Sequence, residues 1–174
     1  MEVLEAIQER SNVRSYLAAP VPEDALERIL EAARLAPSAG NVQSWRFVIV
    51  TDADSRKALS LAAGRQKHVA EAPVVIVAAA VTDGHVMCCG QPAYTMDVAI
   101  ALEHIALQAT AEGLATCWVG AFSEDAAREV IGAPGPPEVR IVQMMTLGYS
   151  AVAPKPKDRK PLSEIVMREQ WGRR

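Results

Sequence analysis

The sequence lacks a surplus of positive charge, a membrane-length apolar run and a secretion signal, and each absence removes a class of function. It has 18 lysines and arginines against 21 aspartates and glutamates, a net charge of −3. A nucleic-acid or membrane-surface partner would require a basic face, so neither partner is expected. The longest apolar run, Pro73 to Val81, has the length of a strand, and the N-terminus lacks the charged-then-apolar order of a signal peptide. We therefore expect a cytoplasmic protein.

Cysteine is also scarce. The three cysteines, Cys88, Cys89 and Cys117, form no even set from which a disulfide framework could be built. Two adjacent thiols do not take tetrahedral zinc positions as readily as a C-x-x-C pair, and no metal site is expected. We expect reduced thiols in a loop and a strand, with a redox role for Cys88 and Cys89 as the alternative.

The common phosphate loops and catalytic sets are missing too. The sequence contains no G-x-G-x-x-G and no G-x-x-x-x-G-K-[ST], so neither loop explains its positive groups. It also offers no Ser-His-Asp, Cys-His or paired-carboxylate arrangement. We therefore predict no catalytic side chain.

Alternating helices and strands are what the sequence does contain. A length of 174 residues suits one domain, residues 1–174, with a sizeable core. Helical patterns cover residues 1–9, 22–37, 53–63, 94–112 and 123–131, and strand patterns cover 45–50, 74–81, 114–122 and 138–149. The first helix is amphipathic, with Val3, Leu4 and Ile7 on one side, and residues 45–50 form a buried strand. Alternation alone favours an α/β sandwich with a mostly parallel sheet.

A polar turn near the N-terminus holds two arginines four residues apart. Arg10 and Arg14 could surround a phosphate, because guanidinium groups bind its oxygens in bidentate fashion. Ser11 and Asn12 between them add a hydroxyl and an amide. The alternative is a solvated helix end, where arginine interacts favourably with the macrodipole. Residue types alone slightly favour this alternative.

A small-residue loop lies between the second helix and the first strand. Pro37 ends the helix, because proline cannot continue the hydrogen-bond ladder. Ala39 and Gly40 carry almost no side chain, so the backbone of Ser38-Ala39-Gly40-Asn41 can approach a ligand closely. A loop of this kind makes a reasonable ligand rim, although it occurs in many folds.

Four segments, in this order, resemble the nitroreductase family of flavin enzymes. Residues 10–16 are similar to its R-R-S-x-R-x-F/Y phosphate motif, with Ser11 and Asn12 replacing the usual residues. Residues 36–47 resemble A-P-S-x-x-N-x-Q-P-W, with Ser44 where the family often has proline. Residues 113–122 resemble G-L-G-T-C-W-I-G-x-F, and residues 157–162 resemble K-x-R-x-P-L.

The resemblance implies an α+β fold with three layers, a central mixed sheet flanked by helices, in a homodimer with FMN at the subunit interface. One subunit would hold the phosphate and ribityl chain through Arg10, Ser11, Asn12, Arg14, Lys157 and Arg159. The flavin ring would lie along Trp118, Val119 and Gly120. The other subunit would cover one flavin face with Pro37, Ser38, Ala39 and Asn41.

The positions of two further polar residues are less strongly indicated. In the family a polar residue near Gln66 approaches the flavin edge, so Gln66 is a candidate. His68 is expected at the surface. The segment 82–93 has no period, and we expect a lid or a surface loop.

The implied function is that of an NAD(P)H-dependent FMN oxidoreductase. Hydride would pass from NADH or NADPH through the flavin to a nitroaromatic, quinone or similar acceptor by a ping-pong mechanism. One alternative is a specialised branch of the family, such as reductive dehalogenation or flavin breakdown. Another is a non-enzymatic flavin-binding or regulatory protein.

Overall fold

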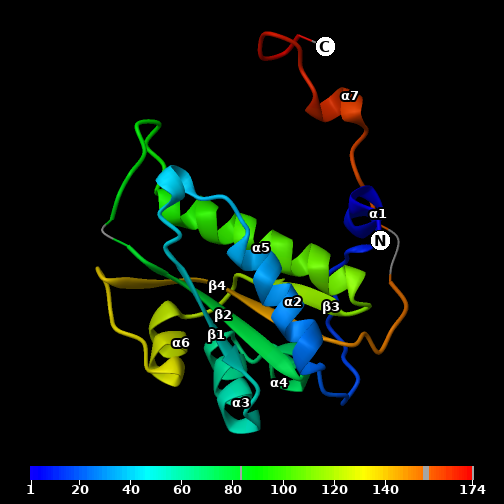
Figure 1. The fold of residues 1–174 in the computed structure, drawn as a ribbon, viewed down its shortest axis with the longest axis vertical. Helices are drawn as coiled ribbons and strands as arrows, with labels where there is room; N and C mark the ends of the chain where they lie inside the picture. Colours follow the sequence, from blue (N-terminus) through cyan, green and yellow to red (C-terminus); the bar gives the residue numbers. More distant parts are fainter. Residues whose placement is uncertain (83, 155–156, 174) are drawn as a thin grey trace.

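The computed structural model describes residues 1–82, 84–154 and 157–173. Its centre is a sheet with the order β1-β2-β4-β3, and helices cover both faces (Figure 1). The strands are β1 (Trp45–Val50), β2 (Val74–Val81), β3 (Ala115–Val119) and β4 (Val139–Gly148). The helices are α1 (Val3–Glu9), α2 (Glu23–Arg34), the 3-10 turn η1 (Ala39–Asn41), α3 (Ala53–Ala62), α4 (Lys67–Glu71), α5 (Ala93–Ala111), α6 (Glu124–Ile131) and α7 (Leu162–Ile165).

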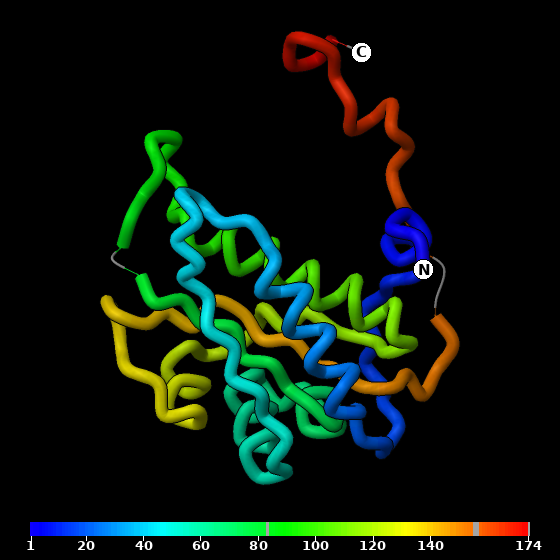
Figure 2. Tube along the Cα trace, in the orientation of Figure 1, coloured from blue at the N-terminus to red at the C-terminus, as the bar shows by residue number. Residues whose placement is uncertain are grey.

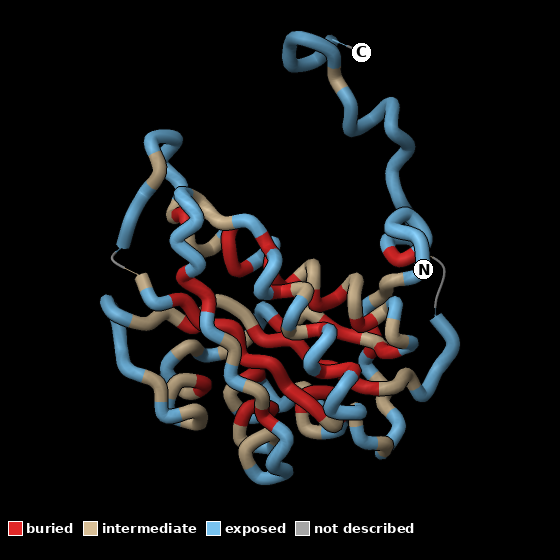
Figure 3. Tube along the Cα trace, in the orientation of Figure 1, coloured by how far each residue is buried: buried red, intermediate tan, exposed pale blue. Residues whose placement is uncertain are grey.

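Strand β2 lies inside the sheet and is buried on both faces. Val74 and Ile76 pack in the core formed with α2 and α5, whereas Val75 and Val77 pack in the core formed with α3, α4 and α6. Because side chains alternate along a strand, a strand covered on both faces needs a continuous apolar sequence. The sequence VVIVAAAV supplies it, and buried residues follow the sheet and the inner helix faces (Figure 3).

The three-layer α+β fold that the resemblance implied is confirmed. The mostly parallel sheet expected from alternation alone was wrong, because every ladder between these four strands is antiparallel. Helices α3 and α4 pack on each other and return the chain beside β1 in the opposite direction, so they do not form a parallel crossover. Among the described residues, the one parallel pairing is the bridge between Asn12 and Thr116, which joins the segment after α1 to β3.

Strand β1 differs from the expectation of a buried strand. It forms one edge of the sheet in the described chain, and Arg46 and Val48 are exposed while Trp45 and Val50 are buried. An edge strand is covered on fewer sides than a central one, which the apolar sequence alone does not reveal.

Helix α1 also departs from its sequence pattern. Its apolar side chains Val3, Leu4 and Ile7 are all at least half exposed, and Ala6 is the buried residue of the helix. The expected apolar side therefore exists, but the described part of this chain does not cover it.

Two short helices, α4 and α7, were not predicted, since each is too short to show a helical period. Helix α7 belongs to an arm, residues 162–173, that extends away from the body of the molecule (Figure 2). Trp171 near its end is 94% exposed.

The segment between β2 and α5 is a loop, as expected, in the part that the structure describes; residue 83 lies outside it. An antiparallel bridge between Val86 and Pro92 closes this loop. Within the described ranges, no helix has both the length and the hydropathy needed to cross a membrane.

Candidate functional site

The polar turn after α1 is fixed alongside the edge strand β3. The backbone N–H of Val13 donates to the carbonyl of Thr116 at 2.9 Å. The hydroxyl of Tyr16 donates to the carbonyl of Val13 at 2.8 Å and lies 2.6 Å from Thr146 Oγ1 on β4. Two of the segments that resemble the family's motifs, residues 10–16 and 113–122, are therefore side by side.

Four cationic side chains from the two ends of the chain form what we call the basic cluster: Arg10, Arg14, Lys157 and Arg159. Burial, followed by the charges of Arg10 and Arg159, lowers the pKa of Lys157. Burial raises the pKa of Cys117 on β3, and the charges of Arg14 and Arg10 act on the same thiol in the opposite direction. Arg10 and Arg159 therefore act on Lys157, and Arg10 and Arg14 act on Cys117, while Lys157 itself lies against the end of α1.

Few carboxylates compensate the basic cluster. Arg10 Nε lies 3.6 Å from Glu103 Oε1 on α5. Within residues 1–82, 84–154 and 157–173, no ion pair is recorded for the other three cations. Repulsion among like charges in one region favours the binding of an anion.

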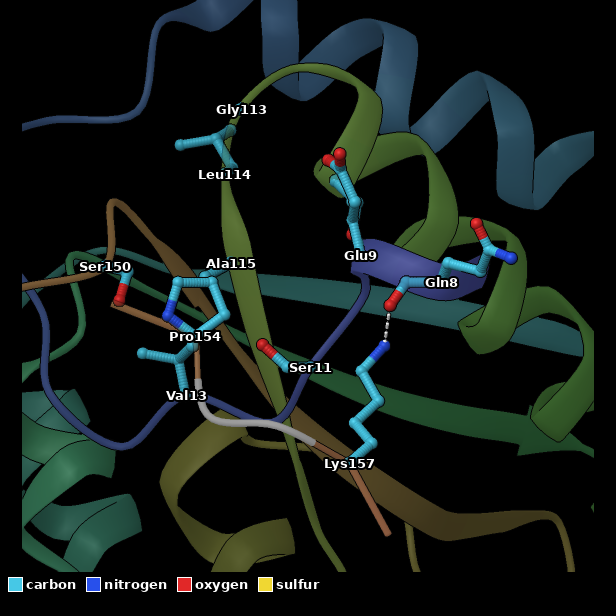
Figure 4. Close-up of a pocket in the computed structure, with 11 residues that line it drawn as sticks. Gln8, Glu9, Ser11, Val13, Gly113, Leu114, Ala115, Ser150, Pro154 and Lys157 are labelled. Atoms are coloured by element: carbon cyan, nitrogen blue, oxygen red, sulfur yellow. Dashed lines mark hydrogen bonds between the residues drawn. The ribbon is translucent and has the colours of Figure 1, made fainter. Parts of the chain in front are cut away.

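Lys157 also links the C-terminal segment to α1. Its Nζ donates to the carbonyl of Ile7 at 3.4 Å and to that of Gln8 (Figure 4). A cation at this position satisfies carbonyls that the helix end leaves without intrahelical partners. Lys157 and Ser11 line a cavity of about 670 Å³ whose other walls are Gln8, Glu9, Val13, Thr110, Gly113, Leu114, Ala115, Ser150 and Pro154.

The C-terminal end of β3 meets the loop before α4. Gln66 Nε2 donates to the carbonyl of Ala121 at 3.1 Å, so Gln66 lies next to the predicted segment Trp118–Gly120. Since Thr116 uses its carbonyl to accept from Val13 at the open edge of β3, alternation directs the N–H of Trp118 toward that same edge. A backbone donor of β3 therefore faces outward, two residues along the strand from the contact with Val13.

The Pro37–Asn41 loop lies elsewhere, beside the N-terminal end of α5. The N–H of Ala39 donates to Asp97 Oδ1 at 3.0 Å, and the N–H of Gln43 donates to Ser38 Oγ at 3.0 Å. Asn41 and Gln43 have positive φ values of 57° and 53°. Each such non-glycine residue costs roughly 1–2 kcal/mol, so the loop has a specific shape that its hydrogen bonds maintain.

A second cavity adjoins this loop. It has a volume of about 640 Å³ and is lined by Ala39, Gly40, Val42, Ser44, Val81, Thr82, His85, Ala93, Tyr94, Asp97 and Glu138. Thr110 lines the first cavity and Ala93 the second, and the helix rises roughly 25 Å between them. The structure thus places residues 10–14 beside β3, Gln66 beside the residues that follow β3, and Lys157 at the end of α1. It leaves the Pro37–Asn41 loop at the other end of α5. Figure 1 shows α1 and the loop before β1 far apart.

His68 is not at the surface, and this expectation was wrong. It is 6% exposed, and burial, followed by the charge of Arg14, lowers its pKa. The short helix α4, which was not predicted, turns this side chain inward.

Two further residues near the predicted set were missed. Asp97 holds the Pro37–Asn41 loop and Glu103 pairs with Arg10. A signal for Asp97 exists in the sequence: it lies four residues before Ala101 and eight before Ile105, on the buried side of α5.

Cys88 and Cys89 are exposed in the loop and Cys117 is buried in β3, in the predicted positions. Among the described residues, no group of three or more histidines, cysteines, aspartates or glutamates is arranged to hold a metal ion.

Comparisons with known proteins give one consistent result. The family model described as "Nitroreductase family" matches residues 7–149. A protein of Thermus thermophilus named "NADH dehydrogenase" is 32% identical, with 93% of each chain covered. The "NADPH-flavin oxidoreductase" of Vibrio harveyi is 26% identical over 97% of this chain and 74% of its own. The crystal structure of a nitroreductase family protein from Clostridium difficile has a TM-score of 0.88 at 30% identity, covering 98% of this chain and 99% of the other.

Proposed function

The chain belongs to the nitroreductase family of NAD(P)H-dependent oxidoreductases, and on this premise we propose that it binds FMN. When bound, FMN would accept a hydride from NADH or NADPH and pass the electrons to a nitroaromatic, quinone or similar acceptor. The observation that carries the proposal is that the arginine-bearing turn, residues 10–14, and Gln66 both lie against β3, while Lys157 lies at the end of the helix that leads into this turn.

The basic cluster fits the phosphate of FMN. A phosphate monoester carries close to two negative charges at neutral pH, and guanidinium groups bind its oxygens through paired hydrogen bonds. Arg14, Lys157 and Arg159 form no ion pair in the described chain. They could therefore bind an anion without breaking an existing ion pair. Ser11 and Asn12 would add hydrogen bonds to the phosphate and the ribityl chain.

The open edge of β3 supplies donors for the polar side of a flat ring. The outward N–H of Trp118 belongs to a strand that β4 holds from one side, so its direction is fixed before any ligand binds. A fixed donor loses no orientational freedom when it binds, which favours both affinity and the stabilisation of charge that develops at a ring nitrogen. The Nε2 of Gln66 donates to the carbonyl of Ala121, so its side-chain amide lies beside the residue that follows Gly120.

A second copy of the chain would complete the site. The Pro37–Asn41 loop is at the other end of α5 and cannot reach the basic cluster of its own chain, but the loop of a partner can. Apolar side chains left exposed on α1 and on the arm, including Leu4, Ile165 and Trp171, offer surface for such a partner to cover. We therefore propose a homodimer with FMN between the subunits.

The cavity beside the Pro37–Asn41 loop would admit the acceptor. Its walls include Val42, Val81, Ala93 and the ring of Tyr94, which suit a flat apolar molecule. In the homodimer this cavity would lie next to the partner's cofactor, since the same loop borders both. One face of the cofactor then serves NAD(P)H and the acceptor in turn.

Ligand uptake gives the first test. The purified protein is expected to be yellow and dimeric and to release FMN rather than FAD. Apo protein titrated with FMN and with riboflavin, which lacks the phosphate, should bind FMN at least about tenfold more tightly, because a charge-assisted contact contributes roughly 1.5–3 kcal/mol. Colourless monomeric protein that takes up no FMN would contradict the proposal, and equal affinities would place the phosphate away from the basic cluster.

Steady-state kinetics test the reaction. Reduction of bound flavin by NADH or NADPH, followed in an anaerobic absorption spectrum, separates an oxidoreductase from a flavin-binding protein without turnover. Initial rates at several fixed acceptor concentrations should give parallel double-reciprocal lines, with NAD(P)⁺ competing against the acceptor. Intersecting lines would show that both substrates bind together and that they do not share one face.

A further inference from the structure

Asp97 is a buried carboxylate whose hydrogen-bond partner is far away in the sequence. It is 5% exposed on the second turn of α5, and its Oδ1 accepts from the backbone N–H of Ala39 at 3.0 Å. In the described part of the chain, no lysine, arginine or histidine forms an ion pair with it. A buried carboxylate is costly unless hydrogen bonds compensate it, so the bond to Ala39 is a principal reason that Asp97 can occupy this position.

The segment that Asp97 holds has a conformation that requires support. Gly40 and Asn41 both have a φ of 57°, in the left-handed region that side-chain-bearing residues rarely adopt. Ser38 braces the loop from within, through the hydrogen bond that its Oγ accepts from Gln43. Asp97 supplies a connection from the loop to a rigid 19-residue helix. Without it, the loop would keep its internal brace and lose a fixed position relative to α5.

We propose that Asp97 is a positioning residue for the cofactor site of the partner subunit. Its carboxylate holds the backbone at Ala39, and thereby keeps the Pro37–Asn41 loop in the place from which it covers FMN bound to the other chain. The inference rests on the proposed function, because only a second copy brings this loop to a basic cluster. Asp97 acts through the loop backbone and not by contact with the cofactor.

The first measurement follows the loop itself in apo protein. Asp97→Ala removes the acceptor, Asp97→Asn keeps an acceptor oxygen at the same position, and Thr95→Val is the matched control. Thr95 Oγ1 donates to the carbonyl of Pro92 at 2.8 Å, so this control weakens the start of α5 without touching the loop. Amide exchange across residues 37–43 is expected to accelerate about tenfold or more in Asp97→Ala, equivalent to at least ~1.4 kcal/mol. It should stay near the wild-type rate in the other two variants.

The second measurement asks in which subunit Asp97 acts. Arg14→Ala and Asp97→Ala chains, carrying different affinity tags, are co-expressed and the mixed dimer is purified. One of its two sites then combines an intact basic cluster with an intact loop, whereas the other site carries both defects. The mixed dimer should regain about half of the wild-type activity, although each parent variant is impaired. A purely structural defect of the Asp97→Ala chain would not be rescued in this pattern.

Several results would overturn the inference. They are unchanged amide exchange in Asp97→Ala, an Asp97→Asn variant as impaired as Asp97→Ala, and a mixed dimer no more active than its parents. Loss of the loop's protection with wild-type FMN affinity and turnover would also overturn it. Wild-type protein that takes up no FMN would overturn the proposed function instead, whereas the exchange data, collected without FMN, would still show whether Asp97 holds the loop.

Discussion

The two ends of α5 are organised by opposite means. Near its C-terminal end, Lys157 lines a cavity together with Thr110, and its pKa is lowered by burial and by the charges of Arg10 and Arg159. Arg14, Lys157 and Arg159 have no carboxylate partner in the described chain. Near its N-terminal end, the Pro37–Asn41 loop is already hydrogen-bonded, from within by Ser38 and from α5 by Asp97. The first region has excess positive charge that an anion would balance. The second region already has its conformation fixed by hydrogen bonds, without any ligand.

In the proposed homodimer, these two regions would contribute differently to the cofactor site. A region of like charges supplies affinity, because binding an anion relieves repulsion as well as forming contacts. A preformed loop supplies geometry, because it loses little freedom when it packs on a ligand. Variants in the basic cluster should therefore change cofactor affinity most. Variants in or beside the Pro37–Asn41 loop should mainly change how the loop is positioned over the cofactor.

Removing two cations should have the largest effect on cofactor affinity. Each charge-assisted contact to phosphate contributes roughly 1.5–3 kcal/mol, so Arg14→Ala combined with Arg159→Ala should weaken FMN binding by about 100-fold or more. The apo fold should survive, since neither arginine forms an ion pair in the described chain. Fluorescence titration measures the affinity and a thermal melt of apo protein checks the fold.

Arg34→Ala is the matched control for this pair. Arg34 pairs with Glu31 on the exposed side of α2, at 2.6 Å, and such surface pairs contribute little to stability. FMN affinity in this variant should stay within about twofold of the wild-type value. An equal loss in the control and in the double variant would show that general charge, and not the basic cluster, attracts the cofactor.

Inorganic phosphate should stabilise the apo protein through the same cluster. A ligand present at ten times its Kd adds about 1.4 kcal/mol to the free energy of unfolding, which raises the Tm of a chain of this size by roughly 3–5 °C. Melts in phosphate and in chloride at equal ionic strength separate specific binding from screening. The gain should disappear in the Arg14→Ala, Arg159→Ala double variant. If phosphate still raises the Tm of the double variant, the anion binds elsewhere and the basic cluster is not the anion site.

The contiguous parts of this arrangement could be predicted from the sequence. Residues 10–14, 37–41 and 118–120 each lie within one short motif, and the length and apolar content of β2 and α5 define these elements before folding. The contacts that join distant segments could not be predicted in the same way. Asp97 and Ala39 are 58 residues apart and Arg10 and Glu103 are 93 apart, so their pairing depends on how α5 lies on the sheet.

Other sequence-based predictions were wrong for different physical reasons. The direction of β2 depends on how α3 and α4 return the chain, which alternation of helices and strands does not specify. The burial of His68 depends on a helix of five residues, too short to produce a period. The exposed side chains of Val3 and Leu4 were expected on an apolar helix face, and the sequence does not say whether the same chain or another covers that face.

A smaller effect is expected on stability at acid pH, through the buried side chain of His68. The pKa of His68 is lowered in the folded protein, by burial and then by Arg14, from an unfolded value of about 6.5. As the pH falls below that value, the unfolded state binds the proton first, so stability decreases until the lowered folded pKa is passed. His68→Phe should remove the part of the decrease in stability at acid pH that His68 causes. Thermal melts between pH 7.5 and 5 should show a smaller decrease in the variant, and parallel decreases would show that His68 is not responsible.

The smallest effect is expected from the two exposed thiols near the loop end. Cys88 and Cys89 lie in a turn closed by the hydrogen bond from Gly90 N–H to the carbonyl of Met87 at 2.8 Å, in the loop that also brings His85 to the second cavity. A region whose task is shape should tolerate the replacement of a thiol by a hydroxyl, because serine keeps the size and the turn. Cys88→Ser combined with Cys89→Ser should therefore leave FMN affinity and NAD(P)H-dependent turnover within about twofold of the wild-type values, a change no larger than ordinary surface substitutions cause. Turnover that collapses while FMN stays bound would show that the thiols carry electrons, and the loop end would then contribute chemistry as well as geometry.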